Sequence, residues 1–197
     1  MFTTVRFNLH EMVTKKSERI LTILLIVVLA ACIAGTVYIA ITPKRGENFT
    51  EFYILGPSGK AEGYPKKLKV NESAAVIIGI ANHEYRKVNY IVEVWLVNLT
   101  IEGNKTVINH MYLLDSFNVT LDHMDISTES WKPQWEKMYN FSVHRKGKYK
   151  LWFLLFKDKA PPLPENRTDY AGTVAEKRIL DAMNGKILSL NLNIVVE

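Results

Sequence analysis

The tripeptide Asn82-His83-Glu84 places an amide, an imidazole and a carboxylate side by side at the end of an apolar run. Imidazole and carboxylate groups can transfer protons or bind a metal ion. Asn and Glu side chains also form the hydrogen bonds that close a turn, which is the simpler interpretation for a segment between two strands. The sequence leaves both interpretations open, and the three residues are candidates for a binding surface.

Metal ligands and catalytic motifs are otherwise sparse. His123 and Asp125 offer two ligands, with Asp122 as a third, although turn residues between strands explain them better. The sequence has no HExxH motif, no glycine-rich phosphate loop, no GxSxG and no CxxC. We therefore expect no enzyme activity, no cofactor and no metal site.

An aromatic cluster, Trp131, Pro133 and Trp135 with Tyr139 nearby, lies in a polar context. Its rings could stack on a sugar, contact a protein partner or lie in the headgroup layer of a membrane. Packing inside the fold is the alternative. The two tryptophans complete the set of candidate binding residues.

Seven Asn-x-Ser/Thr sequons occur in the chain, whereas random placement of its Asn, Ser and Thr residues gives about 1.5. The acceptors are Asn48, Asn71, Asn98, Asn104, Asn118, Asn140 and Asn166. We interpret this excess as N-glycosylation, which requires that this part of the chain lies outside the cytoplasm. The abundance of Asn and Thr in turns is the alternative explanation.

A 22-residue segment without a charged side chain, from Ile20 to Ile41, predicts a membrane helix. At about 1.5 Å per residue it is about 33 Å long, enough to cross a hydrocarbon core about 30 Å thick. Basic residues are more numerous before the segment than shortly after it, which predicts a cytoplasmic N-terminus and an extracellular domain at the cell membrane. We expect a cytoplasmic tail at 1–19, a transmembrane helix at 20–41, a linker at 42–48 and a β domain at 49–197.

Two other interpretations of the N-terminus stay open. Leu29-Ala30-Ala31-Cys32 fits a lipoprotein cleavage box, with the single cysteine of the chain as the lipidated residue. A pilin-like leader would also place an apolar helix before a β domain, although no Lys-Gly or Arg-Gly processing site precedes it. The apolar sequence that continues past Cys32 favours an uncleaved anchor.

The region after residue 48 shows the two-residue period of strands with one buried face. Its alternating apolar sets are Val88, Tyr90, Val92, Val94 and Leu96; Tyr149, Leu151, Phe153 and Leu155; and Leu188, Leu190, Leu192, Ile194 and Val196. The second of these strands is apolar on both faces, which predicts a central position in a sheet. Weaker strands are expected at 52–55, 68–70, 74–81, 106–114, 117–121 and 139–144.

One helix is expected at 169–184, with Thr168 or Asp169 as its cap and Gly185 as its end. Seven or more strands separated by Gly, Pro and Asn turn signals predict an antiparallel β-sandwich. The only cysteine precedes this domain, so packing must stabilise it without an internal disulfide.

Several short motifs resemble a known family. They are FTEFYILG at 49–56, GKA at 59–61, YP at 64–65, GIxNHE at 79–84, NY at 89–90 and LWFLLFKD at 151–158. Together they resemble an archaeal membrane-protein family catalogued as a domain of unknown function, DUF1616. The resemblance implies an archaeal, extracytoplasmic, Ig-like domain with no known activity. Many relatives carry several membrane helices, which leaves open whether a partner supplies that part here.

We therefore expect a membrane-anchored, glycosylated and non-catalytic accessory or assembly subunit of a cell-envelope or membrane complex. Its expected partners are the lipid bilayer and a membrane or envelope protein, with glycans as further candidates. The chain carries 25 basic and 20 acidic residues, and so small an excess gives no reason to expect nucleic acid. The alternatives are a carbohydrate-binding or carbohydrate-processing surface module around His83, Glu84 and the tryptophans, and a filament subunit of the pilin kind.

Overall fold

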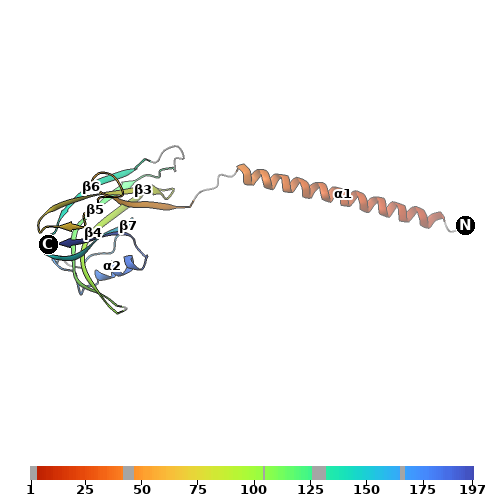
Figure 1. Cartoon of the computed structure of the whole chain (residues 1–197). Coiled ribbons are helices and arrows are strands. Elements are labelled where there is room, and N and C mark those ends of the chain that lie inside the picture. The colour runs from red at the N-terminus through yellow and green to blue at the C-terminus, as the bar shows by residue number, and fades with distance from the viewer. Residues whose placement is uncertain (1–3, 42–46, 104, 126–131, 165–166) are drawn as a thin grey trace. The chain divides into compact units, whose positions relative to one another are not determined.

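The computed structural model describes residues 4–41, 47–103, 105–125, 132–164 and 167–197, with side chains from Lys16 onward (Figure 1). The chain divides into two compact units, Met1–Gly46 and Glu47–Glu197. Within the described residues, the first unit consists of one helix and the second is a β domain.

Helix α1, Thr4–Ile41, is apolar on every side along residues 20–41, where its side chains are exposed. Lipid or another helix would have to cover such a surface. The hydroxyl of Thr36 donates to the carbonyl of Cys32 at 2.7 Å, so this polar side chain is bonded within the helix. The segment Lys16–Ile41, which contains an 18-residue window with a mean hydropathy of 2.9, is long and apolar enough to span a membrane.

The described part of the β domain contains eight strands in two sheets. Their bounds are β1 Phe49–Leu55, β2 Lys67–Leu68, β3 Ser73–His83, β4 Val88–Glu102, β5 Lys105–Leu121, β6 Trp135–Ser142, β7 Gly147–Lys157 and β8 Leu188–Val196. One sheet has the order β1-β3-β6 and the other has the order β2-β8-β7-β4-β5. Neighbouring strands are antiparallel, except that β2 forms a short parallel pair with β8.

Alternate side chains of both sheets fill the space between them. Those with no exposed surface are Val76, Ile78 and Ile80 of β3, Val88, Tyr90, Val92 and Val94 of β4, and Leu151 and Phe153 of β7. Burying such a side chain contributes about 1.5–3 kcal/mol, so a slip of one residue in any of these strands would be costly. The predicted Ig-like β-sandwich is confirmed. The predicted inward-facing residues of β8 pack in or against the core from Leu190 onward, whereas Leu188 is 44 % exposed.

Strand β7 lies between β8 and β4, as its apolar residues on both faces predict. Its second face packs against the segment that follows it, which includes the helix α2, Glu176–Met183. Trp95, Trp152 and Leu154 from the sheet and Ile179 from the helix are buried in this second core. The middle strands β4 and β7 of the larger sheet are therefore covered on both faces.

A buried ion pair lies beneath α2. Arg178 donates from Nε to Oε2 of Glu93 on β4 at 3.0 Å, and the two side chains are 4 % and 3 % exposed. The indole of Trp95 donates to the same oxygen at 2.9 Å, and Arg178 also donates to the carbonyl of Pro161. Burial raises the pKa of Glu93, against the opposing effects of the Trp95 hydrogen bond and the Arg178 charge.

Three predicted elements, one helix and two strands, need correction. The helix predicted at 169–184 begins only at Glu176, because Asp169 does not cap it and instead accepts a hydrogen bond from the backbone N–H of Met111 at 2.9 Å. The strands predicted at 106–114 and 117–121 form the single strand β5. Its register against β4 shifts twice, and such bulges let one strand continue past an extra residue.

The strand register defines two ends of the β domain. At the linker end, where the chain arrives from residues 42–48, Phe49 lies opposite His83. At the far end, Ser73 lies opposite Ser142. Strand β3 runs from one end to the other over 11 residues, which corresponds to about 33 Å.

Candidate functional site

Asn82 lies at the linker end, and its side chain is fully buried. Its amide nitrogen donates to the carbonyls of Arg86 and Leu121 at 2.8 and 2.9 Å. Its amide oxygen accepts from the backbone N–H of Glu84 at 3.0 Å, next to Tyr85, whose φ is 53°. These bonds close the turn between β3 and β4, so Asn82 acts as a turn residue.

His83 is 3 % exposed and has a partner at each ring nitrogen. Nδ1 lies 2.6 Å from the carbonyl oxygen of Met124, and Nε2 lies 3.2 Å from Oε1 of Glu51. A carbonyl can only accept, so Nδ1 carries a proton in this arrangement. The ring also stacks on Phe49, with 4.6 Å between the ring centres. These contacts hold the ring inside the fold and leave neither nitrogen free for a metal ion.

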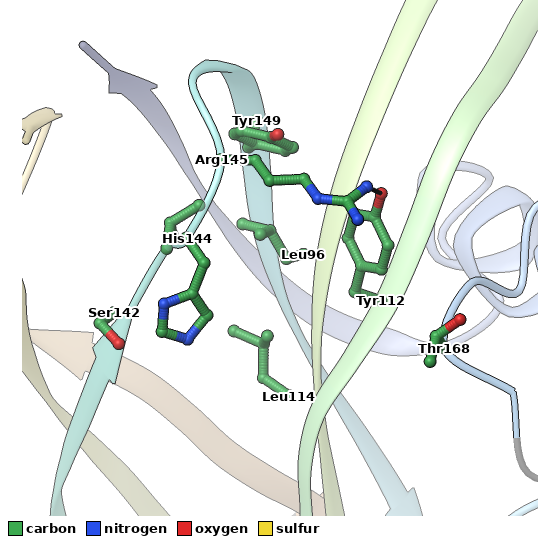
Figure 2. Close-up of a pocket in the computed structure, with 9 residues that line it drawn as sticks. Leu96, Tyr112, Leu114, Ser142, His144, Arg145, Tyr149 and Thr168 are labelled. Atoms are coloured by element: carbon green, nitrogen blue, oxygen red, sulfur yellow. Dashed lines mark hydrogen bonds between the residues drawn. The ribbon is translucent and has the colours of Figure 1, made fainter. Parts of the chain in front are cut away.

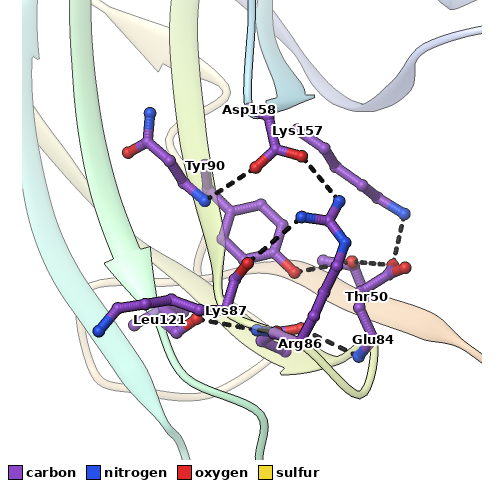
Figure 3. Close-up of polar contacts among 10 residues, drawn as sticks. Thr50, Glu84, Arg86, Lys87, Tyr90, Leu121, Lys157 and Asp158 are labelled. Carbon is purple, nitrogen blue, oxygen red and sulfur yellow. Dashed lines mark hydrogen bonds and ion pairs between the residues drawn. The ribbon is translucent and has the colours of Figure 1, made fainter.

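Glu84 belongs to a polar network that joins β1, β4 and β7 at the linker end (Figure 3). Its carboxylate accepts from the hydroxyl of Thr50 at 2.6 Å and forms an ion pair with Lys157. The hydroxyl of Tyr90 lies 2.9 Å from Thr50 Oγ1. Partial burial acts to raise the pKa of Glu84, but the hydrogen bonds from Lys157 and Thr50 outweigh it and the pKa is lowered. Glu84 is therefore an ionised carboxylate whose hydrogen bond and ion pair link β1 to β7.

His123 and Asp125 pair with each other, with 3.0 Å between Nε2 and Oδ1. The other ring nitrogen accepts from the backbone N–H of Tyr85 at 3.3 Å. Asp122 forms an ion pair with Lys87 at 3.2 Å. Among the residues that the structure describes, no three His, Cys, Asp or Glu side chains are placed to hold a metal ion.

The predicted aromatic cluster is described only in part, because Trp131 lies outside the described residues. Trp135 is half-buried against the core between the sheets, with its ring centre 6.1 Å from that of Phe117. Phe117 lies 6.4 Å from Tyr139, and Nζ of Lys137 lies 3.8 Å above its ring. Trp135 and Tyr139 are thus packing residues where the edge strands β5 and β6 meet.

The sequon asparagines differ in their surroundings. Asn48, Asn71, Asn118 and Asn140 are exposed, whereas Asn104 and Asn166 lie outside the described residues. Asn98 is half-buried, and its amide nitrogen donates to the carbonyl of Lys148 at 2.9 Å. A glycan on that nitrogen would have to fit beside this bond between β4 and β7 at a half-buried side chain.

A pocket with a volume of about 330 Å3 opens at the far end, beside the turn between β6 and β7 (Figure 2). Its apolar lining includes Leu96 of β4, Leu114 of β5 and Val143, which follows β6. Both sheets therefore contribute to it. The volume is near the lower limit of about 300 Å3 for small-ligand pockets in proteins.

The rim of this far-end pocket is polar and positively charged. Arg145 donates from Nη1 to the hydroxyl of Tyr112 at 3.3 Å, and its guanidinium lies 5.9 Å from the ring centre. Nδ1 of His144 lies 2.6 Å from Oδ1 of Asn71, and Thr168 lines the pocket on the opposite side from His144 (Figure 2). Arg145 is exposed, and within the described structure Tyr112 is its one hydrogen-bond partner. Most of its five N–H donors can therefore bind a ligand.

Sequence reasoning missed this pocket, because four separate segments of the chain form it. A local signal existed only for the rim, where residues 144–148 read His-Arg-Lys-Gly-Lys after β6 and into the start of β7. Such a run is also typical of an ordinary exposed turn, so it could not identify a site.

Two of the motifs that carried the family resemblance, FTEFYILG and GIxNHE, pair with each other as β1 and β3, and Tyr64 of the YP motif contacts them. Tyr53 lies opposite Gly79, where an added Cβ would lie 2.1 Å from the tyrosine ring. Tyr64 donates to the carbonyl of Ile54 at 2.9 Å. Together with the bonds of Thr50 and Glu84, these contacts give the motif residues a structural role.

The fold is a β-sandwich in which the middle strands of the larger sheet are covered on both faces, and the described residues include one long apolar helix. The chain belongs to the family described as "Domain of unknown function (DUF1616)", which matches residues 43–174. The predicted family is thereby confirmed. No curated protein matches the sequence.

The similar solved structures are distant. A crystal structure of a CARDB domain from Pyrococcus furiosus, in complex with di-metal ions, is 15% identical with a TM-score of 0.39, over 76% of this chain and 93% of that one. A β-glucosidase from Listeria innocua in complex with glucose is 13% identical with a TM-score of 0.37, over 75% of this chain and 16% of that one. The human seminal-plasma complex of zinc 2-glycoprotein and prolactin inducible protein is 10% identical with a TM-score of 0.36, over 79% of this chain and 100% of that one. None of these similarities carries an argument about function.

Proposed function

We propose that the chain is a single-pass protein of an archaeal cell membrane, with a cytoplasmic N-terminus and an extracellular β domain that binds rather than catalyses. The length and apolar character of α1 support the anchor. The orientation is supported by Arg6, Lys15, Lys16 and Arg19 before the apolar segment and by the seven sequons after it. A linker of seven residues extends by about 25 Å at most, so the β domain would work close to the bilayer.

The proposed role is that of an accessory or assembly subunit of a cell-envelope or membrane complex. The observation that carries it is the far-end pocket, which lies at the end of the sandwich opposite to the attachment of the linker. A domain attached to the membrane helix at one end can present its opposite end to a partner. The N–H donors of Arg145 are exposed at that end. His83 and Glu84 at the linker end are, by contrast, bonded to the domain itself.

Co-purification from native membranes tests this role. The wild type, Arg145→Ala and Lys177→Ala would be isolated in mild detergent, and mass spectrometry would identify proteins recovered in fixed stoichiometry. Lys177 is a matched control, because it is an exposed basic residue on α2, away from the pocket. We expect a membrane or envelope protein with the wild type and Lys177→Ala but not with Arg145→Ala. Recovery of the wild-type chain alone would contradict the assembly role.

The two alternatives make different predictions. A carbohydrate-handling module centred on His83, Glu84 and the tryptophans predicts glycan binding that is lost in Trp135→Ala. A filament subunit predicts polymers in native membranes and a processed N-terminus. The contacts described at the linker end favour neither alternative.

A further inference from the structure

We propose that the far-end pocket binds the carboxyl-terminal end of a partner protein whose last residue is apolar. The inference rests on the proposed function, since it takes the pocket as the binding site of the domain and names the group that is recognised. Four features of the pocket support it: its size, its apolar lining, its charged rim and its position beside two edge strands.

The apolar lining matches an aliphatic or aromatic side chain. Leu96, Leu114 and Val143 face a volume of about 330 Å3. That volume is at the lower end of the range for small-ligand pockets, so it suits a group of the size of one residue better than an oligomer. Removing an apolar side chain from water here would supply about 25 cal/mol per Å2 of buried area.

The rim matches a carboxylate. A guanidinium presents a planar fork of donors that fits both oxygens of a carboxylate, and Arg145 is exposed with most of its donors unused. The exposed side chain of Lys146 adds positive charge to the same turn. Asp169, which follows Thr168 in the chain, bonds His110 at 2.7 Å and a backbone N–H rather than the guanidinium of Arg145.

The position of the pocket matches an extended segment. Strands β5 and β6 are the outer strands of their sheets, and Leu114 and Ser142 place the pocket beside both. An edge strand offers unpaired backbone groups to an incoming chain, which then adds as a further strand. The last residues of a partner could pair in this way while the terminal side chain and carboxylate enter the pocket.

A sugar fits less well. The ring of Tyr112 already packs against His110, with 5.9 Å between the ring centres, and lies 5.9 Å from the guanidinium of Arg145. These neighbours leave less of its face for stacking on a sugar ring. The apolar lining of Leu96, Leu114 and Val143 likewise offers no hydrogen-bond partners for sugar hydroxyls.

Fluorescence anisotropy with the full-length protein in detergent micelles tests the inference. The probe is the peptide Gly-Gly-Ala-Leu, labelled with fluorescein at its N-terminus and carrying a free carboxylate. Its matched controls are the same peptide with a C-terminal amide and a peptide that ends in Ser. We expect the free acid to bind at least about ten-fold more tightly than the amide, because loss of one charged hydrogen-bonded contact costs about 1.5–3 kcal/mol. We expect a loss of similar size for the peptide that ends in Ser, because its last side chain has no apolar surface to bury in the pocket.

Variants assign the preference to the pocket. Arg145→Ala is expected to remove the preference for the free acid, Arg145→Lys to reduce it and Lys177→Ala to leave it unchanged. Arg145 is exposed, so an unchanged unfolding midpoint of the variants would show that the fold is intact. Equal affinity for acid and amide, or a preference that survives in Arg145→Ala, would overturn the inference.

Two further outcomes distinguish binding of a C-terminal peptide from binding of an acidic sugar and from the assembly role alone. Displacement of the peptide by D-glucuronate at a lower concentration than unlabelled peptide would overturn it in favour of an acidic sugar. Loss of a co-purifying partner in Arg145→Ala, without any preference for the free acid, would overturn the inference and leave the assembly role standing.

Discussion

Arg178→Ala removes the positive partner of a carboxylate that stays buried. Glu93 would lose the Nε donor at 3.0 Å and keep the indole N–H of Trp95 at 2.9 Å. The carbonyl of Pro161 would lose a donor as well. Breaking a buried ion pair by removing one partner costs about 3–5 kcal/mol, because the remaining charge is poorly solvated. We expect the β domain to lose this much unfolding free energy at about pH 8.

The loss should depend on pH. Burial raises the pKa of Glu93 and Arg178 opposes that rise, so the substitution raises the pKa further. A carboxyl group whose pKa is raised by folding contributes stability that is present below its unfolded pKa and is lost as the pH rises through its folded pKa. In the variant Glu93 takes up a proton more readily, which removes the unpaired charge. We therefore expect a smaller loss at about pH 5 than at about pH 8.

Urea unfolding of the full-length chain in detergent micelles, followed by tryptophan fluorescence, measures the effect. All four tryptophans lie between residues 95 and 152, so the signal reports on the β domain. Lys177→Ala, an exposed neighbour on α2, should stay within about 0.5 kcal/mol of the wild type. The double variant Glu93→Leu/Arg178→Met should recover most of the loss, because apolar residues replace both charges. A loss below about 1 kcal/mol in Arg178→Ala, or one that is equal at both pH values, would refute the reasoning.

Three further predictions use the same structure. Gly79→Ala should lose about 1–3 kcal/mol in the urea assay, because the added Cβ would lie 2.1 Å from the ring of Tyr53; wild-type stability would contradict that contact. Asn82→Ala should lose about 1–3 kcal/mol, because it leaves buried backbone carbonyls without their donor, and a neutral result would contradict its role in the turn. Glycopeptide mass spectrometry of the native protein should find a glycan on exposed Asn118 and none on Asn98, whose amide nitrogen is bonded inside the sheet. A glycan on Asn98 would contradict the half-buried position of this side chain.

The main strands of the fold could be predicted because the alternation of apolar and polar side chains depends only on residues that are close together in the chain. Val92 and Val94 are buried on one face of β4, and the apolar residues on both faces of β7 predict its central place in the sheet. Helix boundaries were less predictable. Asp169 has the side chain of a helix cap, but it bonds the backbone of Met111 instead, and sequence spacing does not reveal that contact.

The candidate site was harder to predict than the fold. His83 and Glu84 looked suited to chemistry, yet Met124, Glu51 and Lys157 occupy their polar atoms. These partners come from three other parts of the chain. Side-chain type therefore says what a residue can do, whereas the contacts decide whether its atoms remain free to do it.

The sequence by itself determined the properties that depend on neighbours along the chain: an apolar helix long enough for a membrane, strands that alternate and the family motifs. Only the tertiary structure decided the pairing of Glu93 with Arg178, 85 residues apart, and the far-end pocket around Arg145. The physical reason is the distance along the chain over which each feature arises. Helical and strand periods arise within a few residues, whereas a buried ion pair or a pocket exists only once distant segments pack against each other and exclude water.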